Sequence, residues 1–174
     1  AGSLGWLAGE RPWRREFARS GSLEYYASGE GVARSARRLL LKNTVYQGML
    51  RERRMERITA RDVFEAWDRD DPIAAAALDH CIKLWGMMTA DLVSMFNPEM
   101  IVFGGGVFGP AVRFLDRIRA EASLWAQPVS MRRVMLTASA LGEDACLAGA
   151  GFSAFQCISK ENGSPFPGEG QSVM

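Results

Sequence analysis

A short apolar run that ends in three consecutive glycines restricts the fold of this chain more than any other feature. Residues 100–103 read Met-Ile-Val-Phe, and glycines occupy 104–106. Unbroken apolarity over this length predicts a β-strand buried on both faces, as in a parallel sheet. Pro110 then begins a predicted helix, and a second strand is predicted at 133–138. This order of elements predicts an α/β domain in which helices flank a sheet.

A long helix is predicted before this strand. Asp71 suits the N-cap and Pro72 the first helical position, and apolar residues then recur at helical spacing up to Phe96. Asn97-Pro98 ends the helix, because the residue before proline disfavours helical geometry. Thr59 and Asp62 form a capping-box pattern that begins an earlier helix. Further helices are predicted at 23–27, at 32–42, from Pro110 with an apolar face reaching Trp125, and at 146–158.

Composition excludes several classes of protein. The chain has 174 residues, of which 48% are hydrophobic, and this length suits one domain with a real core. The net charge of +1 gives no global field that favours nucleic acid or an anionic membrane. No apolar run is long enough to span a bilayer. The Gly-, Ser- and Pro-rich tail at 160–174 is expected to be disordered.

The three cysteines and the N-terminal residues indicate a cytoplasmic protein. Cys81, Cys146 and Cys157 are an odd number without C-x-x-C spacing, which predicts buried thiols in a reducing compartment. The first residues lack the basic-then-apolar order of a secretory signal.

Single residues give weaker indications of chemistry. His80 has no second histidine to pair with, which favours a structural or surface role. Glu24, near the start of a short helix, is by itself compatible with an ordinary surface carboxylate. The basic segment 51–57, together with Arg11, Arg14, Arg15 and Arg19, could contact phosphates. Acidic residues are mixed in and no helix-turn-helix pattern is present, so a solvated face is favoured and nucleic acid is not an expected partner.

Four segments together resemble one family. GSLEYYASGEGVA is similar to the G-C-L-E-x-Y-A-S-G segment of the ROK proteins (repressor, open reading frame, kinase). ITARDVFEAWDRDDPIAAAALD is similar to their I-T-x-x-D-V-F-E-A-A segment, NPEMIVFGGGVFG resembles N-P-E-x-I-V-L-G-G-G-V, and LGEDACLAGAG resembles their last helix. These four segments in this order are far more specific than any one of them.

The resemblance implies an actin/hexokinase-like (ribonuclease H-like) fold of two lobes, with ATP and a sugar bound between them. Residues 1–159 match only the C-terminal lobe, and the N-terminal lobe with its D-x-G-x-T loop and general-base aspartate has no counterpart in this chain. The expected function is therefore an ATP- and Mg-dependent sugar kinase that is inactive as these 174 residues alone. A sugar-responsive transcriptional regulator and a non-catalytic homologue are the alternatives. The family also implies a homodimer.

The resemblance also assigns residues, and some of them differ from the family pattern. Glu24 matches a glutamate that binds sugar hydroxyls, and Gly104, Gly105 and Gly106 match the loop on the nucleotide side. No catalytic residue is expected in this chain. The family's zinc ligands are replaced by Trp6, Arg15, Phe17 and Ser22, so no zinc is expected. Packing by Trp6 and Phe17 is expected to hold this region instead.

Overall fold

The computed structural model describes residues 3–7 and 12–161. Its α-helices, in chain order, are α1 (Ser22–Ala27), α2 (Gly29–Lys42), α3 (Met49–Glu52), α4 (Ala60–Trp67), α5 (Pro72–Phe96), α6 (Leu115–Trp125), α7 (Pro128–Arg133) and α8 (Ala145–Glu161). Its strands are β1 (Met100–Phe103) and β2 (Met135–Ala138). Short 3₁₀ turns include η1 (Leu4–Trp6), η2 (Arg15–Arg19), η4 (Gly106–Phe108) and η5 (Pro110–Phe114). No helix in this part of the chain is both long and apolar enough to cross a membrane.

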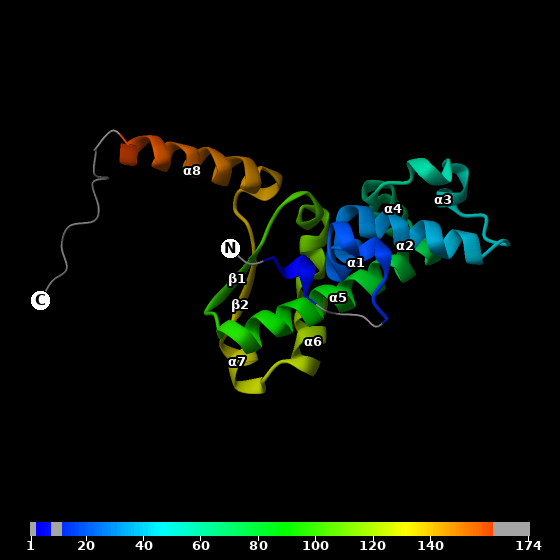
Figure 1. The fold of residues 1–174 in the computed structure, drawn as a ribbon. Helices are drawn as coiled ribbons and strands as arrows, with labels where there is room; N and C mark the ends of the chain where they lie inside the picture. The colour runs from blue at the N-terminus through cyan, green and yellow to red at the C-terminus, as the bar shows by residue number, and fades with distance from the viewer. Residues whose placement is uncertain (1–2, 8–11, 162–174) are drawn as a thin grey trace, which may run out of the picture.

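The long helix α5 forms the centre of a helical body. Helices α1, α2 and α4 pack along one part of it and α6 along another (Figure 1). Leu40 of α2, Val63 of α4, Leu78 of α5 and Ile118 of α6 are each at most 1% exposed. The apolar spacing that predicted α5 therefore faces this shared core, except at its last turn, where Phe96 is 66% exposed.

Both predicted helix starts are confirmed. The Thr59 side chain accepts a hydrogen bond from Asp62 N, and the Asp62 carboxylate accepts one from Thr59 N at 2.8 Å. Asp71 is buried and accepts from Ile73 N at 2.9 Å and Ala74 N at 3.0 Å. The Tyr46 hydroxyl also donates to Asp71. Burial and this hydrogen bond raise the pKa of Tyr46 to about 12.

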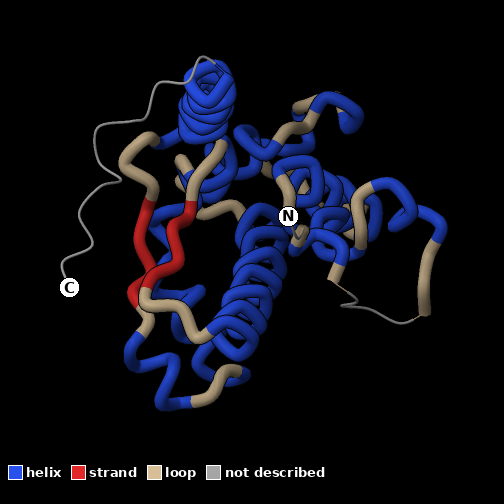
Figure 2. Tube along the Cα trace, turned by 60° about the vertical axis from the view of Figure 1, so that its left-hand side comes forward, coloured by secondary structure: helices blue, strands red, loops and turns tan. Residues whose placement is uncertain are grey.

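The sheet consists of β1 and β2, which run parallel with Met100 opposite Met135 and Phe103 opposite Ala138. Figure 2 shows these strands beside the lower half of the helical body. Side chains alternate between the two faces of a strand. Ile101 and Leu136 face inward and pack against a cluster that includes Val93 and Ala122.

The prediction that β1 is buried on both faces is wrong. Met100 is 49% exposed and Val102 is 56% exposed, and Met135 of β2 is 55% exposed. The cause is the alternation itself: α5, α6 and α7 cover the inner face of the strands, and the outer face stays accessible among the described residues. An apolar run alone could not separate these two arrangements.

The structure corrects three further expectations. Only Cys81 is buried, whereas Cys146 and Cys157 of α8 are exposed, because α8 extends away from the helical body (Figure 1). Trp125 is 61% exposed and does not share the buried face of α6. The last helix continues to Glu161, so it includes the first two residues of the predicted tail, and 162–174 lie outside the described residues.

Candidate functional site

The glycine loop lies at the carboxyl end of both strands, where open α/β sheets bind their ligands. A Cβ on Gly104 would lie 3.0 Å from Ser139 Cβ, because the two strand ends approach closely here. Gly105 has φ of +87°, which a residue with a side chain rarely adopts, and its carbonyl accepts from Phe108 N at 2.9 Å. The backbone therefore requires glycine at 105, and the close approach of Ser139 leaves little room for a side chain at 104.

Gly106 has a different role. Nothing lies within 4 Å of the position that its Cβ would occupy, so its backbone is open to an approaching group. It lines a cavity of about 770 Å³, large enough for a nucleotide-sized ligand. The cavity is bounded by Gly29 at the start of α2, by one face of α4 and by the segment after the loop: Ala60, Arg61, Phe64, Glu65, Asp68, Gly106, Val107, Pro110 and Arg113.

The walls of this cavity combine apolar surface with two guanidinium groups and with the carboxylates of Glu65 and Asp68. Arg113 is held in place by an ion pair with Asp68 and by a 2.9 Å hydrogen bond to the carbonyl of Pro110. Its guanidinium carbon lies 5.8 Å from the centre of the Phe64 ring. Arg61 is exposed in the first turn of α4 and forms no ion pair with the described residues. A base on the apolar wall and a phosphate near Arg61 fit this arrangement.

Glu24 lies on α1 beside the turn η1. A Cβ on Gly5 would lie 2.9 Å from the Cβ of Glu24, so a side chain at position 5 would force a local shift. Gly21, just before α1, has φ of +80° and its Cβ position would clash with the Gly5 carbonyl. The exposed Glu24 carboxylate makes no hydrogen bond or ion pair with any described residue. It is therefore available to accept hydrogen bonds from the hydroxyl groups of a ligand.

Trp85 of α5 connects the helix that carries Glu24 to the glycine loop. Its Nε1 donates to the carbonyl of Ala27, the last residue of α1, at 2.8 Å. Its ring lies 5.1 Å from that of Phe108, which follows the loop. Leu4 of η1 and Gly104 also border one small cavity beside Trp85. The structure thus brings the segment of Glu24 and the loop 104–106 close to the same part of α5, around Trp85.

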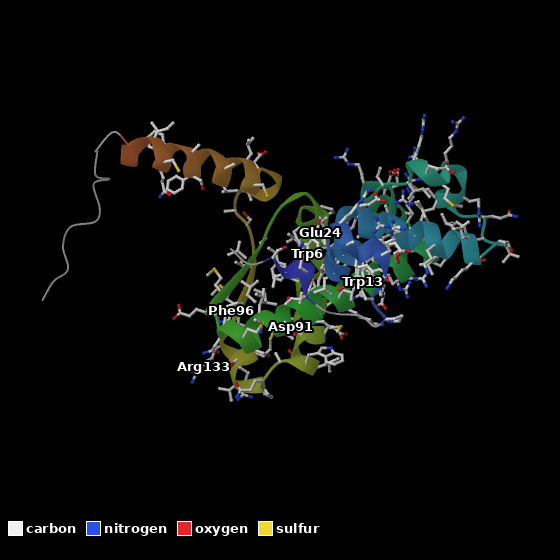
Figure 3. The ribbon with its side chains drawn as sticks, viewed as in Figure 1. Trp6, Trp13, Glu24, Asp91, Phe96 and Arg133 are labelled. Atoms are coloured by element: carbon white, nitrogen blue, oxygen red, sulfur yellow. The ribbon has the colours of Figure 1, made fainter. Side chains whose placement is uncertain are left out.

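The residues that replace the family's zinc ligands do not form one packed cluster. Phe17 is 3% exposed, as expected for a packing residue, but Trp6, on the turn η1 that contacts α1, is 57% exposed (Figure 3). Trp6 therefore does not replace a ligand by burial, which corrects that expectation. The Ser22 hydroxyl donates to the Leu7 carbonyl at 3.0 Å. Within 3–7 and 12–161, no group of three His, Cys, Asp or Glu side chains is placed to hold a metal ion.

Comparison with known proteins identifies the family. The model of the ROK family matches residues 18–156. The chain belongs to the ROK family. A glucokinase of Halalkalibacterium halodurans is 33% identical over 134 residues, which are 77% of this chain and 41% of that protein. A glucokinase of Thermotoga maritima is 26% identical over 55% of this chain and 30% of that protein.

Solved structures of ROK proteins share the fold. A ROK glucokinase from Streptomyces griseus, solved with glucose and AMPPNP, superposes with a TM-score of 0.67 at 28% identity, over 79% of this chain and 46% of that one. A ROK transcriptional regulator homologous to E. coli MLC superposes with a TM-score of 0.66 at 21% identity, over 79% of this chain and 34% of that one. The fold is thus that of the ROK sugar kinases, actin/hexokinase-like, with a small parallel sheet flanked by helices. The chain spans less than half the length of these relatives.

Of the residues that the sequence singled out, Gly106 lines the cavity, whereas Glu24, Gly104 and Gly105 do not; the other lining residues were not predicted. Gly29, the exposed face of α4 and Arg113 come from three segments that are distant in the sequence. The pattern I-T-A-R-D-V-F-E-A carried a signal for α4, because it matched the family, but it did not show which face of the helix borders the loop.

Proposed function

We propose that the protein containing this chain is an ATP-dependent sugar kinase, and that this chain supplies one wall of its cleft. The observation that carries the proposal is the open Gly106 backbone beside the cavity of about 770 Å³. Trp85 links the glycine loop to the helix of Glu24, whose carboxylate has no ion-pair partner among the described residues. The ROK glucokinase relatives support this assignment.

In this proposal, Glu24 accepts hydrogen bonds from sugar hydroxyls and so orients the ring. Phe64, Val107 and Pro110 contact the nucleotide base, while Gly106 N and Arg61 face its phosphates. ATP supplies the γ-phosphoryl group, and Mg²⁺ arrives on the phosphate oxygens. The new bond joins a sugar oxygen to the γ-phosphorus as the bond to ADP breaks. The hydroxyl proton passes to a base outside this chain, as the resemblance implies.

Hexose-dependent ADP release by the full-length protein tests the reaction, and two substitutions test the two sides of the cleft. Glu24→Gln should raise the sugar KM by about tenfold or more, since a charge-assisted hydrogen bond contributes ~1.5–3 kcal/mol. Glu52→Gln, in the exposed part of α3, is the matched control and should change nothing. Unchanged sugar kinetics in Glu24→Gln would exclude Glu24 as a ligand.

Gly106→Ala tests the nucleotide side. The methyl group meets no protein atom within 4 Å, so folding should be preserved while the ATP KM rises. Gly149→Ala in α8, where the Cβ position is equally open, is the control. No ADP release across a panel of hexoses would refute the kinase assignment, and sugar-dependent DNA binding by the full-length protein would favour a regulator.

A further inference from the structure

A second hollow lies between α1, α2, α5 and the segment before η2, and none of its residues borders the proposed nucleotide cavity. It has two neighbouring compartments of about 190 Å³ and 310 Å³. Both compartments are lined by the same four residues, Arg14, Tyr26, Arg38 and His80. The smaller adds Tyr25, Arg34 and Ser35, and the larger adds Ser22, Leu23, Leu84 and Met87.

Basic side chains are the main polar groups of the smaller compartment. Three arginines and the histidine of the chain line it, and Arg34 among them is ion-paired with Glu30 at 3.7 Å. Arg38 takes part in no hydrogen bond or ion pair with the described residues, so its guanidinium retains its donors. A carboxylate ligand needs only one bidentate arginine. Several guanidinium groups around one small space instead suit a phosphate, which carries a dianionic charge and more oxygens.

The walls of this compartment are fixed by contacts within the helical body. Arg34 donates to the Tyr25 carbonyl, and its guanidinium carbon lies 4.0 Å from the centre of the Tyr25 ring. The rings of Tyr25 and Tyr26 meet edge to face at 4.9 Å, and Tyr26 meets His80 in the same way at 5.7 Å. Groups that are already held in place lose little conformational entropy when a ligand binds.

The larger compartment has a different character. Leu23, Leu84 and Met87 give it an apolar wall, and Arg14 and Arg38 stand where it meets the smaller one. A ligand that fills both compartments therefore needs an anionic group at one end and a small carbon skeleton at the other. Inorganic phosphate would leave the apolar wall uncovered.

We propose that this hollow binds a small phosphate monoester, with its phosphate among the arginines and its carbon skeleton against Leu23, Leu84 and Met87. The site is separate from the cleft of the proposed kinase and does not depend on that function. Its occupant would stabilise the junction of α1, α2 and α5, because it contacts all three helices.

Calorimetric titration of the full-length protein with phenyl phosphate, inorganic phosphate and phenol tests the proposal. Phenyl phosphate should bind more tightly than inorganic phosphate, and phenol should not bind at this site. Arg38→Gln should weaken phenyl phosphate by at least about tenfold, and Arg38→Lys, which keeps the charge, by less. Arg133→Gln is the matched control: Arg133 is also exposed and unpaired among the described residues, and it lies on the remote α7 (Figure 3).

Three results would overturn the proposal. The first is equal affinity of wild type and Arg38→Gln for phenyl phosphate. The second is an equal loss in Arg133→Gln, which would indicate only nonspecific attraction to positive charge. The third is binding of phenol as strong as that of phenyl phosphate. Because the experiment measures binding, the absence of kinase activity would not count against this site.

Discussion

Apolar side chains are buried in the helical body but exposed on the C-terminal helix α8. In the body, Leu40 and Leu78 are at most 1% exposed. In α8, Leu147 is 74% exposed and Phe152 is 56% exposed. The helices of the body thus pack against one another to form its core. The two α8 side chains are not buried by any of the described residues. The stability of the folded unit should therefore depend on the body and hardly at all on α8.

Thiol reactivity should show the largest difference between the two regions. Cys81 in the body is fully buried, and burial raises its pKa to about 12, so it reacts only when the body opens. Cys146 and Cys157 of α8 are exposed. Alkylation at pH 8, followed by mass spectrometry, should be about a thousandfold slower or more at Cys81. Comparable rates at all three positions would show that the body is not a closed core.

Truncating a leucine in each region should give the next largest difference, measured as the free energy of unfolding. Leu40→Ala leaves a cavity in the core of the body and should lower the free energy of unfolding by ~2–5 kcal/mol. Leu147→Ala removes the same atoms from an exposed site, and its effect should stay within about 0.5 kcal/mol. Urea denaturation measures both. A large loss in Leu147→Ala would mean that α8 packs against the body in solution.

Trp85→Phe tests the link between α1 and the glycine loop. It keeps most of the buried ring but leaves the Ala27 carbonyl without its donor, at a cost of ~1–3 kcal/mol. Trp125→Phe is the control, because the Trp125 indole donates to Glu121 on an exposed surface and should cost under about 0.5 kcal/mol. Thermal denaturation of the two variants compares them. Equal costs would contradict the role assigned to Trp85.

The last prediction concerns alkaline pH. The pKa of Tyr46 is raised to about 12 in the folded protein, so the stability that its neutral form contributes is fully present below pH 10. That contribution is lost as the pH rises from about 10 through 12, because the unfolded chain ionises first. Tyr46→Phe should flatten this part of the curve of unfolding free energy against pH. An unchanged slope would exclude Tyr46 as its source.

The sequence predicted those elements whose signals are local. Thr59 and Asp62 begin α4, and Asp71 and Pro72 begin α5, because a cap needs only neighbouring residues. The environment of β1 could not be predicted in the same way. Whether Val102 is covered depends on which elements pack on the sheet, and an apolar run of this length is compatible with one covered face or two.

The site shows the same division. The backbone requirement at Gly105 accompanies a glycine run that is visible in the sequence, and Glu24 was proposed through the family pattern. The cavity beside Gly106 was not predicted, because Gly29 on α2, the face of α4 and Arg113 on η5 border it only after the chain has folded. Local sequence patterns therefore predict the individual segments of the site. The distances between these segments depend on how the helices pack in the core.

The first residue of α2 has a practical consequence for the cavity that it borders. A Cβ on Gly29 would lie 3.4 Å from Val107 Cγ2 and 3.8 Å from Ala60 Cβ, which are ordinary van der Waals contacts. The backbone there can accept a side chain, and alanine favours helices more than glycine does. Successively larger residues at position 29 would therefore shrink the cavity in small steps while the helices around it keep their places. Such a variant could be paired with a smaller analogue of the ligand, which the wild-type cavity does not distinguish from the full ligand.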